Sequence, residues 1–269
     1  MRVVALWRYP VKSTLGEEMA ELRVDSGGVD GDRALAVIDT FTGFVATAKH
    51  PRLWRMLLEF AAMTEDRVFI TFPDGTKLPA DAPAVAPRLS AVLGRSITVS
   101  GIRPDGASVE RPAPEDVLDH GVTAVVSAQT LEIGQGSPGC SFVDHSPVHL
   151  ITTATLRHLG TESVRYRPNL IVDTPPGTAA FVENSWLGRE IQIGDDAGAR
   201  LRVTIPTPRC AVPSLAHGAL PRDPDAVRTV MKGNRIEVPG FEGAKPCAGA
   251  YAEVIRSGTV RVDDPITMP

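Results

Sequence analysis

Ile205-Pro206-Thr207-Pro208-Arg209-Cys210 is the stretch of sequence around which we arrange the rest of the chain. The apolar residues 201–205 lead into it and are typical of a strand. Because proline cannot donate a ladder hydrogen bond, the two prolines predict that the chain leaves the sheet here and turns. A guanidinium beside a thiol favours the thiolate, which is the form that attacks an electrophile or ligates a metal. The turn is therefore a candidate reactive site, with an inert buried cysteine as the alternative.

Length and composition indicate a globular protein. The 269 residues are enough for one large or two ordinary domains, and 43% of them are hydrophobic. A net charge of −4 argues against a nucleic-acid-binding surface, which is usually basic. No uncharged run approaches the ~20 residues of a membrane span, and the N-terminus lacks the pattern of a signal peptide. We therefore expect a soluble cytoplasmic protein that contacts neither nucleic acid nor membrane.

The three cysteines, Cys140, Cys210 and Cys247, are odd in number and far apart in the sequence. This pattern matches neither a disulfide framework nor the Cys-x-x-Cys spacing of zinc and iron–sulfur sites. Redox chemistry would therefore need a cofactor from outside the chain. We assign no role to Cys140 or Cys247, for which packing or loop positions are the default.

Residues 1–102 are predicted to form a strand-rich N-terminal domain with a few helices. Short apolar runs separated by glycine and proline are typical of strands joined by turns. Residues 51–63 carry apolar side chains at helical spacing and predict an amphipathic helix. The predicted strands are 3–7, 34–39, 68–72 and 97–100, and a second helix is predicted over 84–93.

Residues 103–269 are predicted to form a β-barrel-like domain. Its first part, residues 103–120, is rich in Pro, Asp and Glu and is typical of a connecting segment. Thr152 or Thr153 is placed to cap a helix that ends near Leu159. The predicted fold class is thus mainly β, with the mixed α+β character that a few helices give. The predicted strands are 148–151, 170–173, 191–193, 201–205, 250–255 and 259–262, with a helix over 223–231 and a loop around Cys247.

Two clusters of polar residues point only weakly to chemistry. Asp144-His145-Ser146 holds the residue types of a hydrolytic triad, but triad members meet in space rather than in sequence. His145 and His149 would face one metal ion if they lay on a helix. Pro147 argues against that helix, so we expect an exposed and a packed histidine instead.

Anion-binding side chains recur in loops beside the predicted strands. Arginine and lysine bind phosphate and carboxylate, and loops held by a sheet are where binding residues concentrate. Each of these side chains alone is more often an ordinary surface cation. Together with a thiolate they would suit an anionic ligand that carries a metal. The residues concerned are Lys12, Ser13, Arg33, Arg167 and Arg209, with Cys210 as the thiolate.

These motifs, in this order, resemble the MOSC proteins, named for the C-terminal domain of molybdenum cofactor sulfurase. Tyr9-Pro10-Val11-Lys12-Ser13 and Gly31-Asp32-Arg33 resemble the N-terminal β-barrel domain that is attached to them. Residues 144–159 resemble the start of the MOSC domain, and Arg209-Cys210 matches its cysteine motif. The resemblance covers nearly the whole chain and includes Arg167-Pro168-Asn169, Glu183 with Trp186, Gly249-Ala250-Tyr251, Gly258 and Asp263.

The resemblance implies binding of molybdenum cofactor, a pterin dithiolene that carries a phosphate. Cys210 would then be both the catalytic thiolate and the ligand to molybdenum. Proteins of this architecture include the amidoxime-reducing component and bacterial N-hydroxylated base-analogue reductases. The resemblance thus implies a small N-hydroxylated substrate and a separate ferredoxin- or flavin-type electron donor, and the family is also associated with pyridoxal phosphate binding. The residues implied to hold the pterin and its phosphate are Lys12, Ser13, Arg33, Thr152, Arg167 and Arg209.

Two segments depart from the pattern of the reductases. Residues 211–218 lack the Asp-Pro and Thr-Gly element expected after the cysteine, and residues 240–247 also differ. Both segments are expected near the mouth of the cofactor site, so the sequence does not decide which substrate is bound or whether the protein turns it over. The alternatives are a sulfur carrier or sulfurtransferase with a persulfide on Cys210, and a protein that carries the cofactor without catalysis.

Overall fold

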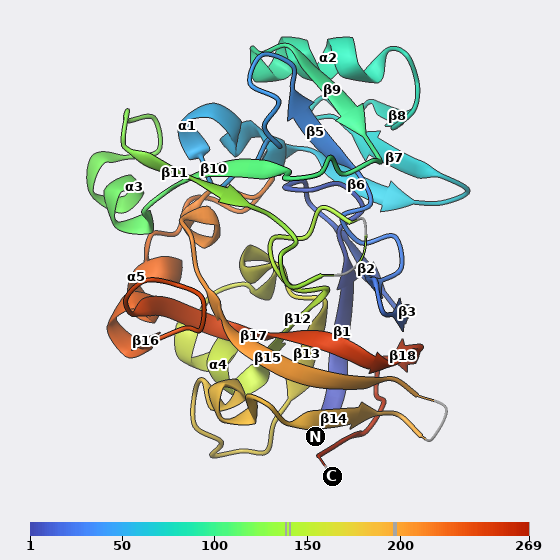
Figure 1. Ribbon diagram of the computed structural model, residues 1–269, viewed down its shortest axis with the longest axis vertical. Helices are drawn as coiled ribbons and strands as arrows, with labels where there is room; N and C mark the ends of the chain where they lie inside the picture. Colours follow the sequence, from blue (N-terminus) through green and yellow to red (C-terminus); the bar gives the residue numbers. More distant parts are fainter. Residues whose placement is uncertain (138, 140, 196–197, 269) are drawn as a thin grey trace.

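The computed structural model describes residues 1–137, 139, 141–195 and 198–268. A large sheet and one small sheet fill one half of the molecule and the other small sheets fill the other half, and both ends of the chain lie in the half with the large sheet (Figure 1). The predicted fold class, mainly β with mixed α+β character, is confirmed. Within the described residues, no helix is long and apolar enough to cross a membrane.

The large sheet has the strand order β19-β14-β15-β17-β12-β13-β1-β2, and β16 pairs with β17 outside this path. Alternate residues of a strand point to the same face, and those of this sheet form a common core that includes Val3, Leu150 and Leu201. Leu22 and Val260, from the paired strands β3 (Glu21–Asp25) and β18 (Gly258–Arg261), also pack into this core. The strands of the large sheet are β1 (Arg2–Arg8), β2 (Glu17–Met19), β12 (Val148–Thr152), β13 (Leu170–Asp173), β14 (Glu190–Ile193), β15 (Arg200–Pro208), β16 (Arg235–Ile236), β17 (Lys245–Arg256) and β19 (Ile266–Thr267).

The first strand ties the N-terminal part of the chain to the large sheet. β1 pairs antiparallel with β13, with Arg2 opposite Asp173. The parallel strands β12 and β13 are connected through α4 (Thr153–Leu159), where Thr152 Oγ1 accepts a hydrogen bond from Thr155 N at 3.2 Å. The predicted helix cap is therefore confirmed. The division of the chain between residues 102 and 103 stays a prediction.

The smaller sheets surround a second core. Val37, Trp54 and Leu89 pack together there, and the helix that carries Leu89 ends at Gly94 with a left-handed φ of 67°. The strands outside the large sheet are β3 (Glu21–Asp25), β4 (Gly28–Val29), β5 (Ala36–Asp39), β6 (Ala61–Thr64), β7 (Val68–Thr71), β8 (Lys77–Pro79), β9 (Ile97–Ser100), β10 (Ser108–Pro112), β11 (Ala128–Glu132) and β18 (Gly258–Arg261). The other helices are α1 (Pro51–Trp54), α2 (Val85–Leu93), α3 (Pro114–His120) and α5 (Asp225–Gly233), with 3-10 turns η1 (Arg55–Glu59), η2 (Ser163–Tyr166), η3 (Val182–Trp186) and η4 (Val212–Ser214).

The helix predicted over residues 51–63 is wrong in its last part. α1 and η1 account for residues 51–59, and the chain then extends into β6. β6 pairs with β7, with Ala62 opposite Ile70, and Leu15 N donates to Phe60 O at 2.8 Å. The hairpin with β7 and the bonds to distant Leu15 together outweigh the helical pattern.

Contrary to the prediction from the sequence, β15 continues through both prolines. Pro206 lies opposite Ala250 and Pro208 opposite Cys247 of β17, with an irregular register between the two pairs. Such bulges accommodate residues without a backbone donor, so the chain leaves the sheet only at Arg209. Cys247 accordingly lies in a strand and is fully buried, whereas the sequence predicts a loop.

The segment predicted to connect two domains, residues 103–120, has regular structure of its own. It contains β10 and α3, and β10 pairs with β11 as a hairpin. Val109 of this hairpin packs with Phe142 and Val45 in a small core cluster. The segment therefore contributes buried apolar contacts in addition to linking the two halves.

Candidate cofactor-binding site

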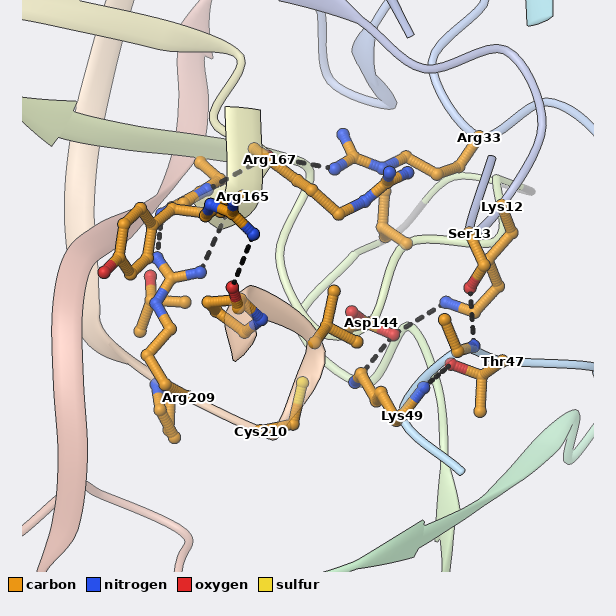
Figure 2. A pocket seen from close by; sticks show the side chains of 18 of the residues that line it. Lys12, Ser13, Arg33, Thr47, Lys49, Asp144, Arg165, Arg167, Arg209 and Cys210 are labelled. Carbon is orange, nitrogen blue, oxygen red and sulfur yellow. Dashed lines mark hydrogen bonds and ion pairs between the residues drawn. The ribbon is translucent and has the colours of Figure 1, made fainter. Parts of the chain in front are cut away.

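A cavity lies where loops of the N-terminal half meet the end of β15 (Figure 2). The loop after β1 contributes one side, and the turn after β15 contributes the opposite side. The residues predicted from the sequence that line this cavity are Lys12, Ser13, Arg33, Arg167, Arg209 and Cys210. Its wall also includes polar residues that no sequence motif had assigned to a site, among them Thr47, Lys49, Arg165 and Thr207.

Left-handed backbone brings several of these side chains to the cavity. Ser13, Arg33 and Arg167 have φ values of 66°, 46° and 55°. Residues other than glycine seldom adopt this conformation, so surrounding contacts must hold it. Arg33 N donates to Tyr9 O at 2.7 Å, and Ser13 Oγ accepts from Ala48 N at 3.1 Å. Such strain gathers at ligand sites, and here it converges on one cavity.

Arg33 and Arg167 lie against the buried ring of Tyr9, with their guanidinium carbons 4.5 and 4.3 Å from its centroid. Arg33 forms an ion pair with Asp32 and donates to Arg167 O at 3.2 Å. Arg167 donates from Nη1 to Thr14 O at 2.6 Å, but its Nη2 is buried without a partner among the described residues. Burial, and then the Arg33 charge, lower the pKa of Arg167 to about 10. The arginine pair thus has unused capacity to bind an anion.

Two lysines share one carboxylate on another side of the cavity. Lys12 Nζ and Lys49 Nζ lie 2.6 and 2.8 Å from Asp144 Oδ1, and Lys12 also donates to Phe142 O at 2.8 Å. Burial lowers the pKa of Lys12 to about 8 although Asp144 opposes this shift. Burial would raise the pKa of Asp144, but the two ammonium groups more than offset it and hold that pKa well below its usual range. Asp144 is therefore ionised at neutral pH, and Lys12 is close to its titration range.

Arg209 uses most of its donors within the protein. Nε donates to Ala248 O at 2.8 Å, Nη1 to Tyr166 O at 2.9 Å, and Nη2 lies 2.5 Å from His149 Nε2. His149 Nδ1 lies 3.2 Å from Arg167 O, so the ring donates there and accepts from Arg209. Burial, and then the Arg209 charge, hold the pKa of His149 well below its usual range, which keeps the ring neutral. Arg209 therefore fixes the turn that carries Cys210 and is only partly available to a ligand.

The two cysteines that the structure describes differ in their access to the cavity. Cys210 is 9% exposed and lines the cavity beside apolar Leu58 and Val212. Cys247 is 0% exposed, and burial raises the pKa of its thiol to about 12. Cys140 lies outside the described residues. Of the two cysteines described, Cys210 is the one placed to meet a ligand.

Thr152, which the resemblance implies as a cofactor-binding residue, does not line this cavity. It is fully buried, caps α4, and donates from Oγ1 to Glu183 Oε2 at 2.9 Å. Glu183 also accepts from Thr155 Oγ1 at 2.8 Å and from Gly249 N at 3.0 Å, and burial raises its pKa. The hydroxyl of Thr152 is engaged in this network, so the structure does not bring Thr152 together with the other predicted site residues, and its role toward a cofactor stays a prediction.

The two histidines suspected of metal binding do not form a metal site. His149 lies in β12 and is occupied by Arg209, while His145 bonds Ser146 Oγ at 2.8 Å and stacks on Tyr251 at 5.8 Å between centroids. Over residues 1–137, 139, 141–195 and 198–268, no group of three or more His, Cys, Asp or Glu side chains could hold a metal ion.

Two family profiles match the chain. The MOSC N-terminal beta barrel domain matches residues 1–107, and the MOSC domain matches residues 137–267. Among solved structures, the YUAD protein from Bacillus subtilis aligns over 98% of this chain and 93% of its own, with 13% identity and a TM-score of 0.45. YiiM from Geobacillus stearothermophilus aligns over 46% of this chain and 54% of its own, with 15% identity and a TM-score of 0.31. No curated protein sequence matches the chain.

Proposed function

The chain belongs to the MOSC-domain proteins that carry a MOSC N-terminal β-barrel domain, and from this premise we propose that it binds molybdenum cofactor and reduces N-hydroxylated compounds. Electrons would come from a separate donor protein of the ferredoxin or flavin type. The observation that carries this proposal is the thiol of Cys210 in a cavity walled by buried cations. MOSC domains are associated with this cofactor, whose binding to this chain is part of the proposal.

The donor set of the cavity fits the two ends of such a cofactor. A phosphate suits the arginine pair, because the unpartnered Nη2 of Arg167 gains a charge-assisted hydrogen bond. A soft metal suits thiolate, which only Cys210 of the described cysteines presents to the cavity. Lys12, Ser13, Arg33 and Arg167 would hold the pterin and its phosphate, and Cys210 would ligate molybdenum. Arg209 would hold the Cys210 turn in place.

The reaction requires that an N–O bond breaks, that two electrons and two protons are taken up, and that water leaves. When bound, the cofactor supplies the two-electron redox chemistry. The chain supplies proton-bearing groups at the ammonium nitrogens of Lys12 and Lys49, which both reach the cavity. Asp144 is ionised and orients them, since its pKa lies well below neutral pH. Leu58 and Val212 exclude water near Cys210.

The first experiment measures molybdenum in protein produced by a host that makes the cofactor. Wild type and Cys247→Ala are expected to carry near-stoichiometric metal, whereas Cys210→Ala should lose it or hold it loosely. Loaded protein is then mixed with a reduced ferredoxin- or flavin-type donor and a panel of hydroxylamines, amidoximes and N-hydroxy bases. If loaded protein reduces no member of the panel, that result would falsify the proposed reductase function.

The alternatives give different outcomes in the same preparation. A sulfurtransferase would lack molybdenum and would gain a persulfide on Cys210, but not on Cys247, after incubation with a cysteine desulfurase. A carrier would load the metal, reduce no substrate, and transfer the cofactor to an acceptor apoenzyme.

A further inference from the structure

Two buried polar atoms without a partner lie in the wall of the Cys210 cavity. Within the described part of the chain, Nη2 of Arg167 and Oγ1 of Thr207 are both buried, both lack a hydrogen bond, and both residues line this cavity. Buried polar groups in folded proteins are nearly always paired, so an unpaired one needs an explanation. A ligand that fills the cavity supplies that explanation for both atoms.

Thr207 occupies an unusual place in β15. It lies between two prolines, at the irregular position where Pro206 is opposite Ala250 and Pro208 is opposite Cys247. The residue is 2% exposed, so bulk water does not reach its hydroxyl. The flanking prolines fix the backbone and hold the side chain at the cavity wall.

Thr204, on the same strand, shows what an ordinary threonine does there. Its Oγ1 donates to Tyr251 O at 3.2 Å, and the residue is not part of the cavity wall. Thr204 is therefore satisfied within the protein, whereas Thr207 is not. Because Thr207 has no partner among the described residues, its hydroxyl is available to bind a ligand in the cavity.

We propose that the Thr207 hydroxyl is a ligand-binding group that donates a hydrogen bond to an anionic oxygen of the ligand held at Cys210. The inference rests on the proposed function for the identity of that ligand. The donor role follows from the charge of the cavity, because Lys12, Arg33 and Arg167 select a ligand rich in acceptors. A hydroxyl can rotate to meet such an acceptor. Figure 2 shows these cations and Cys210 around one space.

The substitution Thr207→Val separates binding from stability, because valine has nearly the shape of threonine and lacks the hydroxyl. In the ligand-free protein it removes an unsatisfied buried group, so the melting temperature should rise by about 2–4 °C. In the loaded protein it removes a hydrogen bond to a charged group, so molybdenum should be lost about tenfold faster during gel filtration. A residue with a purely structural role would not give effects of opposite sign.

Two further variants complete the test. Thr204→Val should lower the melting temperature of the ligand-free protein and leave molybdenum retention unchanged, because it leaves Tyr251 O without its donor. Thr207→Ser keeps a hydroxyl and should retain molybdenum as wild type does. The readouts are the molybdenum-to-protein ratio, the fluorescence of the oxidised pterin, and the melting temperature of protein made without cofactor.

The proposal is overturned if loaded Thr207→Val keeps molybdenum as firmly as wild type. It is also overturned if the ligand-free variant melts at a lower temperature than wild type, since the hydroxyl would then have a partner within the protein. A wild type that takes up no molybdenum would instead defeat the proposed function, and this inference with it. The molybdenum content of wild type therefore tells the two failures apart.

Discussion

The network around Glu183 and the cavity around Cys210 are both buried and polar, but they differ in how their polar atoms are paired. In the network, the Glu183 carboxylate accepts from Thr152, Thr155 and Gly249 at 2.8–3.0 Å. In the cavity, Arg167 Nη2 and Thr207 Oγ1 have no partner among the described residues. A paired network stabilises the fold, whereas unpaired donors lower stability until a ligand satisfies them. Substitutions in the two regions should therefore change different measured quantities.

The largest expected effect on folding comes from Glu183→Ala. It removes the acceptor of Gly249 N and of the Thr152 and Thr155 hydroxyls and leaves a buried cavity, so we expect the free energy of unfolding to fall by about 4 kcal/mol. Urea unfolding of wild type and variant measures this change in free energy. Glu190→Ala is the control, since that carboxylate is partly exposed and pairs with Arg202 at 2.9 Å, which is worth at most about 1 kcal/mol. Equal effects of the two substitutions would contradict the distinction.

Gly249→Ala tests the point where the two regions meet. A Cβ there would lie 2.5 Å from both His149 Nε2 and Leu150 O and 3.2 Å from Arg209 Nη2, at a φ of +76°. We expect a loss of about 3 kcal/mol in unfolding free energy together with weaker molybdenum retention, because His149 must move and its contact with Arg209 is then disturbed. Gly188 has the same φ of 76°, but a Cβ added there would meet nothing within 4 Å, so Gly188→Ala should cost only about 1 kcal/mol. If both variants lose the same unfolding free energy, the loss in Gly249→Ala does not come from contact of the new methyl group with His149 and Leu150.

Acid should destabilise the folded protein through its buried histidines. Burial lowers the pKa of His217 to about 4, while an unfolded histidine takes up its proton near its ordinary value of 6.5. Between these values the unfolded chain binds the extra proton, so stability falls as the pH is lowered, by up to about 1.4 kcal/mol per pH unit for each such histidine. His149 shifts in the same direction. Urea unfolding from pH 6.5 to 4.5 should show this slope, reduced in His217→Gln and unchanged in His120→Gln, whose ring is exposed.

The smallest predicted effect concerns alkaline pH and ligand retention. Lys12 in the free cavity has a pKa of about 8, and an anionic ligand favours its charged form. Binding should therefore weaken as the pH rises, by roughly fourfold between pH 7 and 8.5. Molybdenum retention measured at several pH values tests this. Lys12→Met should retain less metal at every pH without the alkaline decline, and an unchanged decline in that variant would assign the titration to another group.

The sequence predicts the parts of this molecule that depend on local pattern. The first strand, the helix after β12 and its Thr152 cap follow from apolar runs and a capping residue. Helical spacing over residues 51–63 misleads in its last part, because Ala61 and Ala62 join a hairpin that also bonds Leu15, far away in the sequence. Thr152 shows another limit of the sequence: its motif is matched, but the bond of its hydroxyl to Glu183 is visible only in the structure.

Only some of the cavity residues could be predicted from the sequence. Lys12, Arg33 and Cys210 could be singled out because they belong to motifs with a known order, and the structure brings them to one cavity. Their roles toward a cofactor stay predictions. Lys49 belongs to no motif, and Thr207 lies in the stretch that leads to Cys210 but has no role of its own in the sequence. Their significance comes from the contact of Lys49 with Asp144 and from the unpaired hydroxyl of Thr207. Only three-dimensional structure reveals such partners or their absence.

The pairing of β1 with β13 has a consequence for how the chain reaches this fold. Arg2 must find Asp173, so the first strand waits for a segment that is synthesised much later. Closing so long a loop is slow, and sheets built from distant segments fold slowly for that reason. Until then the edge of β1 that will meet β13 is open to pairing with other chains. We expect that newly made protein depends on chaperones during this interval, and that its yield is limited by the kinetics of folding more than by the final stability.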